Sequence, residues 1–261
     1  MTTGNRLQLP DVAIYTYCWG TEHTKRSLKT LLISMDQVDF KRAVLITDPS
    51  RTDMNELAPV LDKYNIEVCE MRSNLNENML DDDENRFGFR DDFLEHVKEY
   101  MTDDFCLNVQ HDSCVINPSL WSPKFLHTDY IGAPWPMQII QSSDMVAGRI
   151  PTEQIPTTVG NGGFSIRSRK FVENSVGLES HHKNEDLNIC IFNYHHLASQ
   201  GVKIADEATA AQFSFERPTQ RKPHAKPRLF FTYGTFGFHG DFNVGGMEWI
   251  NRRWNKLGVE L

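Results

Sequence analysis

Cysteine is scarce in this sequence and follows no recognisable pattern. Five cysteines occur among 261 residues, at Cys18, Cys69, Cys106, Cys114 and Cys190. They form no Cys-x-x-Cys pair and no spacing typical of a zinc site. An odd number of cysteines in mostly apolar surroundings indicates buried free thiols, and therefore a reducing compartment.

Long hydrophobic runs are also lacking. No stretch approaches the roughly 20 apolar residues that a membrane helix needs. Residues 1–10 are polar and have no apolar signal core, so we expect a cytoplasmic protein. Residues 247–256 combine tryptophans with basic side chains. This leaves a peripheral membrane contact open, although a terminal helix packed on the domain is the more common arrangement.

Basic residues are fewer than acidic residues, with 27 Lys and Arg against 35 Asp and Glu. The formal net charge is −8, so we do not expect a general nucleic-acid-binding surface. An acidic protein can still bind an anionic nucleotide through a local metal ion or a helix amino terminus. Internal repeats and interdomain linkers are absent from the sequence as well, and we therefore expect a single domain over residues 1–261.

Short apolar segments alternate with helical patterns in the first half. We expect strands at residues 12–17, 43–47, 66–71 and 105–109, and helices at residues 24–35, 54–64 and 90–101. Such alternation is typical of parallel βαβ units. The sequence thus predicts an α/β fold with a mostly parallel, Rossmann-like central sheet flanked by helices.

The second half is less regular. We expect a loop at residues 137–158, a helix at 187–197 that stops at Gly201, a strand at 202–205 and a short helix at 207–213.

Polar residues follow or end three of the predicted strands, at Tyr17, Asp48 and Asp112. Ligands of open α/β sheets bind outside the carboxyl ends of the strands. We therefore expect Tyr15, Thr16 and Tyr17 to contact the base and ribose of a nucleotide, and Asp48 to accept a hydrogen bond from the base. Ordinary strand-end packing is the alternative for each of them.

Glycine is concentrated in one segment, where Gly160, Gly162 and Gly163 occur within four residues. Without a Cβ atom, the backbone here can approach another molecule closely. Phe164, Arg167 and Phe171 then recur at helix-like spacing. A tight turn followed by an ordinary helix is the alternative to a binding surface.

Two adjacent acids, Glu185 and Asp186, open the next apolar-periodic segment. A carboxylate pair near a crowded backbone surface is what a sugar transferase needs to deprotonate an acceptor hydroxyl. The alternative is that these acids complement the dipole of a helix whose N-cap is Asn184.

Five motifs together resemble a family of poorly characterised bacterial and viral GT-A-type glycosyltransferase domains. They are residues 110–113 (Gln-His-Asp-Ser), 129–135 (Asp-Tyr-Ile-Gly-Ala-Pro-Trp), 160–168 (Gly-Asn-Gly-Gly-Phe-Ser-Ile-Arg-Ser), 185–187 (Glu-Asp-Leu) and 236–240 (Phe-Gly-Phe-His-Gly). The resemblance covers roughly residues 10–245. More distantly, the Gly-Gly-Phe segment and the acidic pair are similar to galactosyltransferases of the lactose-synthase kind.

The resemblance implies an inverting glycosyltransferase that uses a nucleotide-sugar donor and a glycan or lipid-linked acceptor. The donor half would span about residues 10–115 and the acceptor half about 116–245. It implies that Asp186 is the catalytic base, with Glu185 as the second candidate. The residues expected at the acceptor are Trp135, which would stack on a sugar ring, and Gly162, Gly163 and Phe164.

The usual metal motif of such enzymes has two aspartates flanking one residue, and this sequence departs from it. Gln110 occupies the first position and only Asp112 remains. The resemblance implies Asp112 and His239 as ligands of Mn²⁺ or Mg²⁺, but metal dependence stays open. A strand-end aspartate and a packed histidine are the alternatives.

Two other functions compete with sugar transfer. The missing aspartate favours a catalytically silent carbohydrate-binding module on the same fold. A nucleotidyltransferase would need a glycine-rich phosphate loop after the first strand, and residues 18–21 (Cys-Trp-Gly-Thr) are a poor one.

Overall fold

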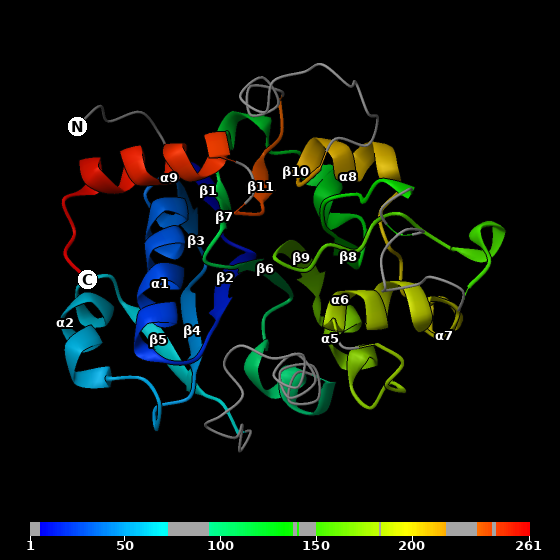
Figure 1. Cartoon of the computed structure of the whole chain (residues 1–261), viewed down its shortest axis with the longest axis horizontal. Helices are drawn as coiled ribbons and strands as arrows, with labels where there is room; N and C mark the ends of the chain where they lie inside the picture. The colour runs from blue at the N-terminus through cyan, green and yellow to red at the C-terminus, as the bar shows by residue number, and fades with distance from the viewer. Residues whose placement is uncertain are drawn as a thin grey trace.

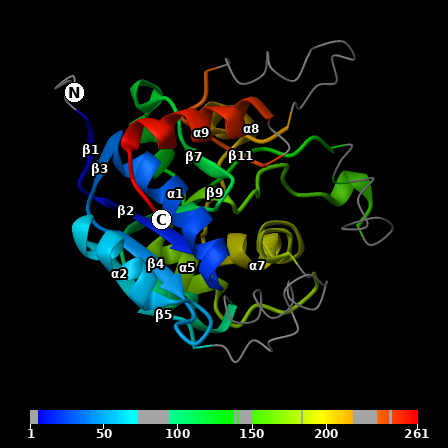
Figure 2. The same cartoon turned by 60° about the vertical axis from the view of Figure 1, so that its left-hand side comes forward.

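The computed structural model describes residues 6–72, 94–137, 140, 150–182, 184–217, 234–241 and 244–261. It confirms the predicted fold class, because a mostly parallel sheet lies at the centre and helices flank it (Figures 1 and 2).

The central sheet has the strand order β5, β4, β2, β6, β9, β8. In that order the strands are Ile66–Glu70, Ala43–Thr47, Val12–Tyr17, Phe105–Val109, Phe164–Ser168 and Tyr130–Ile131. The first four run parallel, β9 is antiparallel to β6, and β8 is antiparallel to β9. The four strands predicted in the first half are therefore confirmed, with one end shifted from Met71 to Glu70.

Alternate side chains of these strands enter two separate cores. On β2, Ile14 packs with helices α1 (Thr21–Met35) and α2 (Met54–Lys63). Tyr15 lies in the opposite core with helical residues 94–100 and α5 (Arg169–Ser175). Strands that are buried on both faces consist of continuous apolar residues, and this is why the apolar runs predict their positions.

A second sheet joins distant parts of the chain. Strand β11 (Gly237–His239) lies between β10 (Ser214–Phe215) and β7 (Ser113–Val115), and it is antiparallel to β7. The register places His239 opposite Ser113. This pairing brings His239 next to the segment that follows β6.

The remaining elements are peripheral. They are the paired strands β1 (Leu7–Leu9) and β3 (Val38–Phe40), the short helices η1 (Pro118–Leu120), η2 (Pro123–Leu126) and η3 (Thr152–Gln154), helix α8 (Glu207–Phe213) and helix α9 (Val244–Leu257). Helix α8 confirms the prediction for residues 207–213. Helix α9 packs against α1, and Ile250 shares a core with Ile33.

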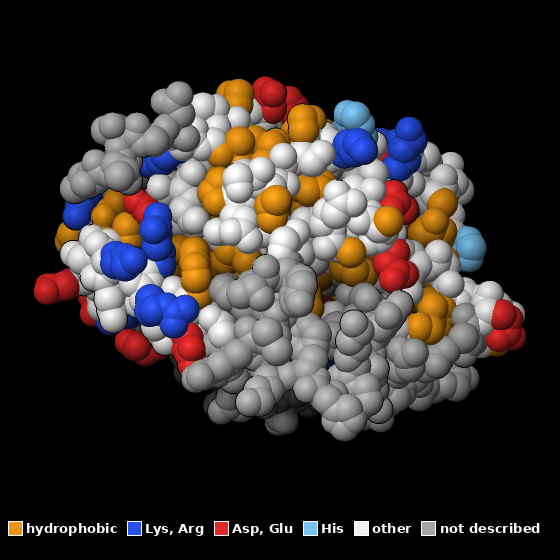
Figure 3. Space-filling view, turned by 90° about the horizontal axis from the view of Figure 1, so that it is seen from above, with side chains coloured by type: hydrophobic (Ala, Val, Ile, Leu, Met, Phe, Trp, Pro, Cys, Tyr) orange, Lys and Arg blue, Asp and Glu red, His pale blue; other side chains and the backbone are white. Residues whose placement is uncertain are grey.

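Among the described residues, no helix is long and apolar enough to cross a membrane. On the described part of the face seen from above, basic, acidic and hydrophobic side chains are intermixed (Figure 3).

Two features of the second half differ from the sequence pattern. The helix-like spacing of Phe164 and Phe171 does not reflect one helix, because β9 ends at Ser168, whose hydroxyl accepts a hydrogen bond from Phe171 N and caps α5. Residues 202–205 form no strand and contribute a single bridge between Ile204 and Tyr130.

The helix predicted at residues 187–197 is present, but it is not one regular helix. It divides into α6 (Glu185–Leu187), the π-helical segment η4 (Asn188–Phe192) and α7 (Tyr194–Ser199). The π turn forms because Asn193 donates both its backbone N–H and its side-chain amide to Asn188 O. Gly201 follows α7 with a positive φ of 73°, as predicted for a helix stop. Much of the predicted loop at 137–158 and the start of the predicted helix at 90–101 lie outside the described residues.

Candidate active site

Residues 129–135 pack against the glycine turn at residues 160–163 and stabilise it. The Tyr130 hydroxyl lies 2.7 Å from Gly160 O and 2.8 Å from Asn161 O, and it donates to these carbonyls. A Cβ on Gly132 would lie 2.0 Å from Asn161 O, and one on Gly160 would lie 2.5 Å from the ring of Trp135. The motifs at residues 129–135 and 160–168 are therefore parts of one packed unit.

Two residues predicted at the acceptor contribute to packing. Trp135 is 8% exposed and packs with Leu187 and Ile191. Phe164 is fully buried, and its ring stacks on Phe213 at 5.2 Å between centroids. The structure places both side chains in packed cores, and an acceptor contact by either ring stays a prediction.

Asp186 is attached directly to the glycine turn. Its Oδ2 accepts a hydrogen bond from Gly162 N at 3.1 Å, and its Oδ1 accepts one from Leu187 N at 2.8 Å. Burial, followed by repulsion from the neighbouring Glu185 carboxylate, raises the pKa of Asp186 to about 7. A carboxyl that titrates near neutrality is suited to proton transfer.

Glu185 has a different environment from its neighbour. Its Oε1 lies 2.6 Å from Nη2 of Arg167, and both side chains are buried. The guanidinium also lies 5.8 Å from the ring centroid of Tyr130. Among the described residues, the acidic pair therefore consists of one carboxylate paired with a buried arginine and one that accepts hydrogen bonds from backbone N–H groups.

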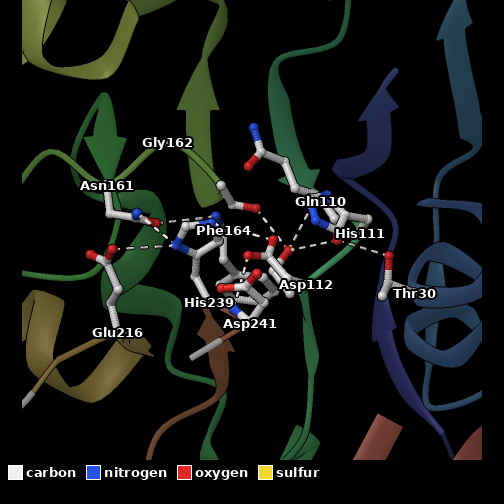
Figure 4. Close-up of polar contacts among 12 residues, drawn as sticks. Thr30, Gln110, His111, Asp112, Asn161, Gly162, Phe164, Glu216, His239 and Asp241 are labelled. Carbon is white, nitrogen blue, oxygen red and sulfur yellow. Dashed lines mark hydrogen bonds and ion pairs between the residues drawn. The ribbon is translucent and has the colours of Figure 1, made fainter. Parts of the chain in front are cut away.

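The other side of the turn faces Asp112 and His239 (Figure 4). His239 Nε2 lies 3.4 Å from Asp112 Oδ1, and Asp241 N donates to Asp112 Oδ2 at 3.1 Å. A Cβ on Gly163 would lie 2.2 Å from the His239 ring and 2.8 Å from Gln110 Oε1. Gly163 thus allows His239 and Gln110 to pack directly on the backbone.

His239 lies between two carboxylates. Its Nδ1 is 3.6 Å from Glu216 Oε1 and 2.9 Å from the side-chain amide of Asn161 (Figure 4). Burial alone would lower the pKa of His239, but Glu216 and Asp112 outweigh this effect and raise the pKa to about 9. Without a bound cation, these two acids therefore favour the protonated form of His239.

The chemistry of Asp112 and His239 also fits a divalent cation, which would replace the proton of the imidazole. Asp112 Oδ1 is buried and accepts no hydrogen bond from the described part of the chain. A carboxylate oxygen and an imidazole nitrogen 3.4 Å apart can reach one ion, since adjacent ligands at about 2.1 Å from an ion lie roughly 3 Å apart.

Asp112 and His239 would need further ligands from elsewhere. Within the described ranges, no group of three or more His, Cys, Asp or Glu side chains could hold a metal. Two protein ligands suffice for a cation that is otherwise held by phosphates and water.

Tyr15 lies away from this site. Its hydroxyl donates to Asp103 Oδ2 at 2.6 Å and accepts from Arg42 Nη2 at 2.9 Å. Arg42 and Asp103 precede strands β4 and β6, so they mark the amino edge of the parallel sheet. The hydroxyl of Tyr15 therefore lies at the amino edge and not at the carboxyl edge, and a donor contact by Tyr15 stays a prediction.

The other predicted donor residues remain at the carboxyl edge. Tyr17 is buried with its ring at 62° to that of Tyr100. Thr16 is also buried, and its hydroxyl has no hydrogen-bond partner among the residues described. Asp48 accepts hydrogen bonds from the backbone and hydroxyl of Ser50 and lies 3.6 Å from Arg51. Asp48 thus stabilises its own turn.

Sequence reasoning missed Glu216 and His23. His23 Nε2 lies 3.3 Å from His111 Nδ1, and its ring meets that of Trp19 edge to face. Burial and then His111 lower the pKa of His23 to about 4. No sequence pattern marks contacts between residues so far apart, although His23 lies in the first turn after β2, where a ligand edge is expected.

Residues 69–231, more than half of the chain, match the family described as "Protein of unknown function (DUF5672)". A search of curated proteins gave no match.

The structure resembles that of the galactosyltransferase LgtC in complex with donor and acceptor sugar analogues. The TM-score is 0.53 at 12% identity, covering 95% of this chain and 97% of that one. An active-site mutant of LgtC gives a TM-score of 0.53 at 13% identity, with 94% and 95% covered. A mannosyltransferase from Pyrobaculum calidifontis in complex with GDP-Man and Mn²⁺ gives 0.43 at 10%, with 77% and 57% covered. The fold is thus of the GT-A glycosyltransferase type.

Proposed function

The chain belongs to the DUF5672 family of proteins of unknown function, and for this member we propose a glycosyltransferase. It would move a sugar from a nucleotide-sugar donor to a hydroxyl of a glycan or lipid-linked acceptor. The observation that carries the proposal is the turn at residues 160–163. This turn holds Asp186 through Gly162 and packs against His239 through Gly163.

Asp186 is the proposed general base. Each of its oxygens accepts one backbone hydrogen bond, and a carboxylate oxygen has a further lone pair that can take a proton. Its pKa of about 7 suits proton removal near neutral pH. Direct deprotonation of an acceptor hydroxyl by Asp186 gives an inverting displacement, which NMR of the product's anomeric proton would test.

Asp112 and His239 are the proposed contacts of the donor diphosphate. They would hold Mn²⁺ or Mg²⁺ together with phosphate oxygens, and a bound ion would offset the charge on the leaving nucleoside diphosphate. In the absence of an ion, the protonated imidazole of His239 places positive charge at the same point. Gly163 keeps this ring against the backbone, while Asp241 N holds the second oxygen of Asp112.

We also propose a reducing compartment such as the cytoplasm, which the free thiols support. All five cysteines are free, and Cys18, Cys106, Cys114 and Cys190 are buried.

A silent carbohydrate-binding module is the second candidate, favoured by Gln110 in place of an acid. The packed ring of Trp135 counts against it. Donor hydrolysis without acceptor separates the two functions, because a silent module produces none.

The first experiment is a thermal-shift panel of UDP, GDP, CDP and dTDP with and without Mn²⁺. A ligand at a hundred times its Kd adds about 2.7 kcal/mol to the free energy of unfolding. We expect one nucleotide to stabilise the wild type, and Asp112→Asn to lose most of that gain while remaining folded. Failure of every nucleotide to stabilise the wild type would contradict the proposal.

A further inference from the structure

Arg167 lies on β9, an interior strand of the sheet, where a charged side chain is unusual. It lies opposite Cys106 of β6 and Tyr130 of β8, and it is 1% exposed. A buried guanidinium is costly unless it is paired, and a well-packed apolar residue would often be at least as stable. Stability alone therefore gives no reason for the pair between Arg167 and Glu185.

Both Glu185 and Asp186 are connected to the same glycine. Gly162 N donates to Asp186, while Gly162 O accepts from Arg167 Nη2 at 3.3 Å and from Asn108 Nδ2 at 2.8 Å. A Cβ on Gly162 would lie 3.0 Å from Arg167 Nη2 and from both carboxylate oxygens of Glu185. The ion pair thus packs against the backbone that holds Asp186.

We infer that Arg167 is a positioning residue for the reaction; this inference rests on the proposed function. Its ion pair with Glu185 commits that acid to the protein and fixes Gly162, so that Asp186 alone of the two acids is presented to the acceptor.

The charges around Asp186 support this arrangement. Two acids repel the negative form of Asp186: Glu185 on the same helical turn and Glu216, which follows β10. His239 on β11 attracts that negative form. Arg167 on β9 is balanced by Glu185 at 2.6 Å. Asp186 therefore keeps its proton to higher pH than an ordinary aspartate.

In the described part of the chain, two further titratable neighbours of Asp186 are Tyr130 on β8 and Cys190 on η4. Burial raises the pKa of both groups well above their ordinary values. They stay neutral over the range in which Asp186 titrates, so they do not obscure its titration.

The test is a titration of the side-chain carboxyl carbons by ¹³C NMR, with Asp186 assigned from its loss in Asp186→Asn. Glu185→Gln keeps the shape and the carbonyl acceptor for Arg167 but removes one negative charge. We expect the titration midpoint of Asp186 to fall by at least about one pH unit, equivalent to about 1.4 kcal/mol. Glu173→Gln, on the exposed side of α5, is the matched control and should leave the midpoint unchanged.

A second variant tests the positioning itself. Arg167→Met combined with Glu185→Gln removes both charges, so no unpaired charge stays buried and the fold should survive. We expect hydrolysis of UDP-galactose, UDP-glucose or GDP-mannose, whichever the wild type accepts, to fall at least about tenfold in kcat with KM little changed. A purely structural pair would change the melting temperature and leave kcat at the wild-type value.

Either an unchanged Asp186 midpoint in Glu185→Gln or a wild-type kcat in the folded double variant would overturn the inference. If the proposed function itself is wrong, the results differ from these. The wild type then hydrolyses no nucleotide sugar, while the Asp186 midpoint still shifts in Glu185→Gln.

Discussion

Replacing Gly163 by alanine tests whether the site depends on direct packing of His239 against the backbone. The added Cβ would lie 2.2 Å from Cδ2 and Nε2 of His239 and 2.8 Å from Gln110 Oε1. Ordinary contacts of a Cβ begin at about 3.4 Å in a close-packed interior, so the ring must move by roughly 1 Å. Gly163 is not among the glycines with positive φ, and the cost is therefore steric rather than conformational.

The size of the effect follows from this displacement. Overpacking of a core costs about 1 to 3 kcal/mol, which lowers the melting temperature by about 2 to 4 °C per kcal/mol in a chain of this size. Movement of His239 also disrupts its 3.4 Å contact with Asp112. We expect Gly163→Ala to weaken nucleotide binding at least about tenfold, or about 1.4 kcal/mol.

The assay compares melting temperatures with and without the nucleotide that stabilises the wild type. Gly246→Ala is the matched control, because its Cβ would lie 2.4 Å from the ring of Phe238 and not against His239. The control should keep its response to nucleotide. A Gly163→Ala protein with wild-type stability and wild-type response would refute the described packing.

Three further predictions follow from particular contacts. Asp186 has a folded pKa of about 7 against an ordinary 3.8, so its contribution to stability is complete below pH 3.8 and is lost as the pH rises through 7. Urea unfolding at pH 5 and pH 8 should show Asp186→Asn gaining about 1 to 3 kcal/mol relative to the wild type between these pH values, and a constant difference would contradict this. Tyr130→Phe leaves Gly160 O without its donor and should cost about 1 to 3 kcal/mol in the same assay; a neutral effect would disprove its supporting role. Tyr15→Phe should cost about 1.5 to 3 kcal/mol by losing the hydrogen bond to the Asp103 carboxylate. It should keep the full nucleotide response, and a lost response would indicate that Tyr15 contacts the donor.

The strands of the first half can be predicted because each is largely enclosed by the sheet and its helices. A segment such as β2 is then a largely apolar run that begins directly after Asp11. The apolar pattern cannot tell whether the polar tip of a strand side chain lies at the carboxyl edge or at the amino edge of the sheet. The strand pattern places Tyr15 at the ligand edge, but its hydroxyl reaches Asp103 at the amino edge.

The second half is harder to predict for a different physical reason. Phe164 and Phe171 show helical spacing although they belong to a strand and to the helix that follows it, and the boundary depends on one cap at Ser168. The π turn depends on the backbone and side-chain bonds from Asn193 to Asn188. Single hydrogen bonds of this kind leave no periodic signal in a sequence.

The candidate site is predictable where a motif marks it and not elsewhere. The family resemblance pairs Asp112 with His239, and the structure places them 3.4 Å apart. Glu216 pairs with His239 and Arg167 pairs with Glu185. These residues are far apart in the sequence, so only the fold reveals the contacts. The resemblance also assigns Trp135 to a sugar, and the fold adds that its buried ring supports the turn.

The most direct test of the proposed reaction is the rate at which Asp186→Asn releases nucleoside diphosphate from the nucleotide sugar that the wild type accepts. We predict a loss of about 10² to 10⁴ in rate, as expected for removal of a general base, with the variant folded and still stabilised by the nucleotide. A folded variant that turns over at the wild-type rate would contradict the assignment of Asp186 and, with it, the proposed centre of the reaction.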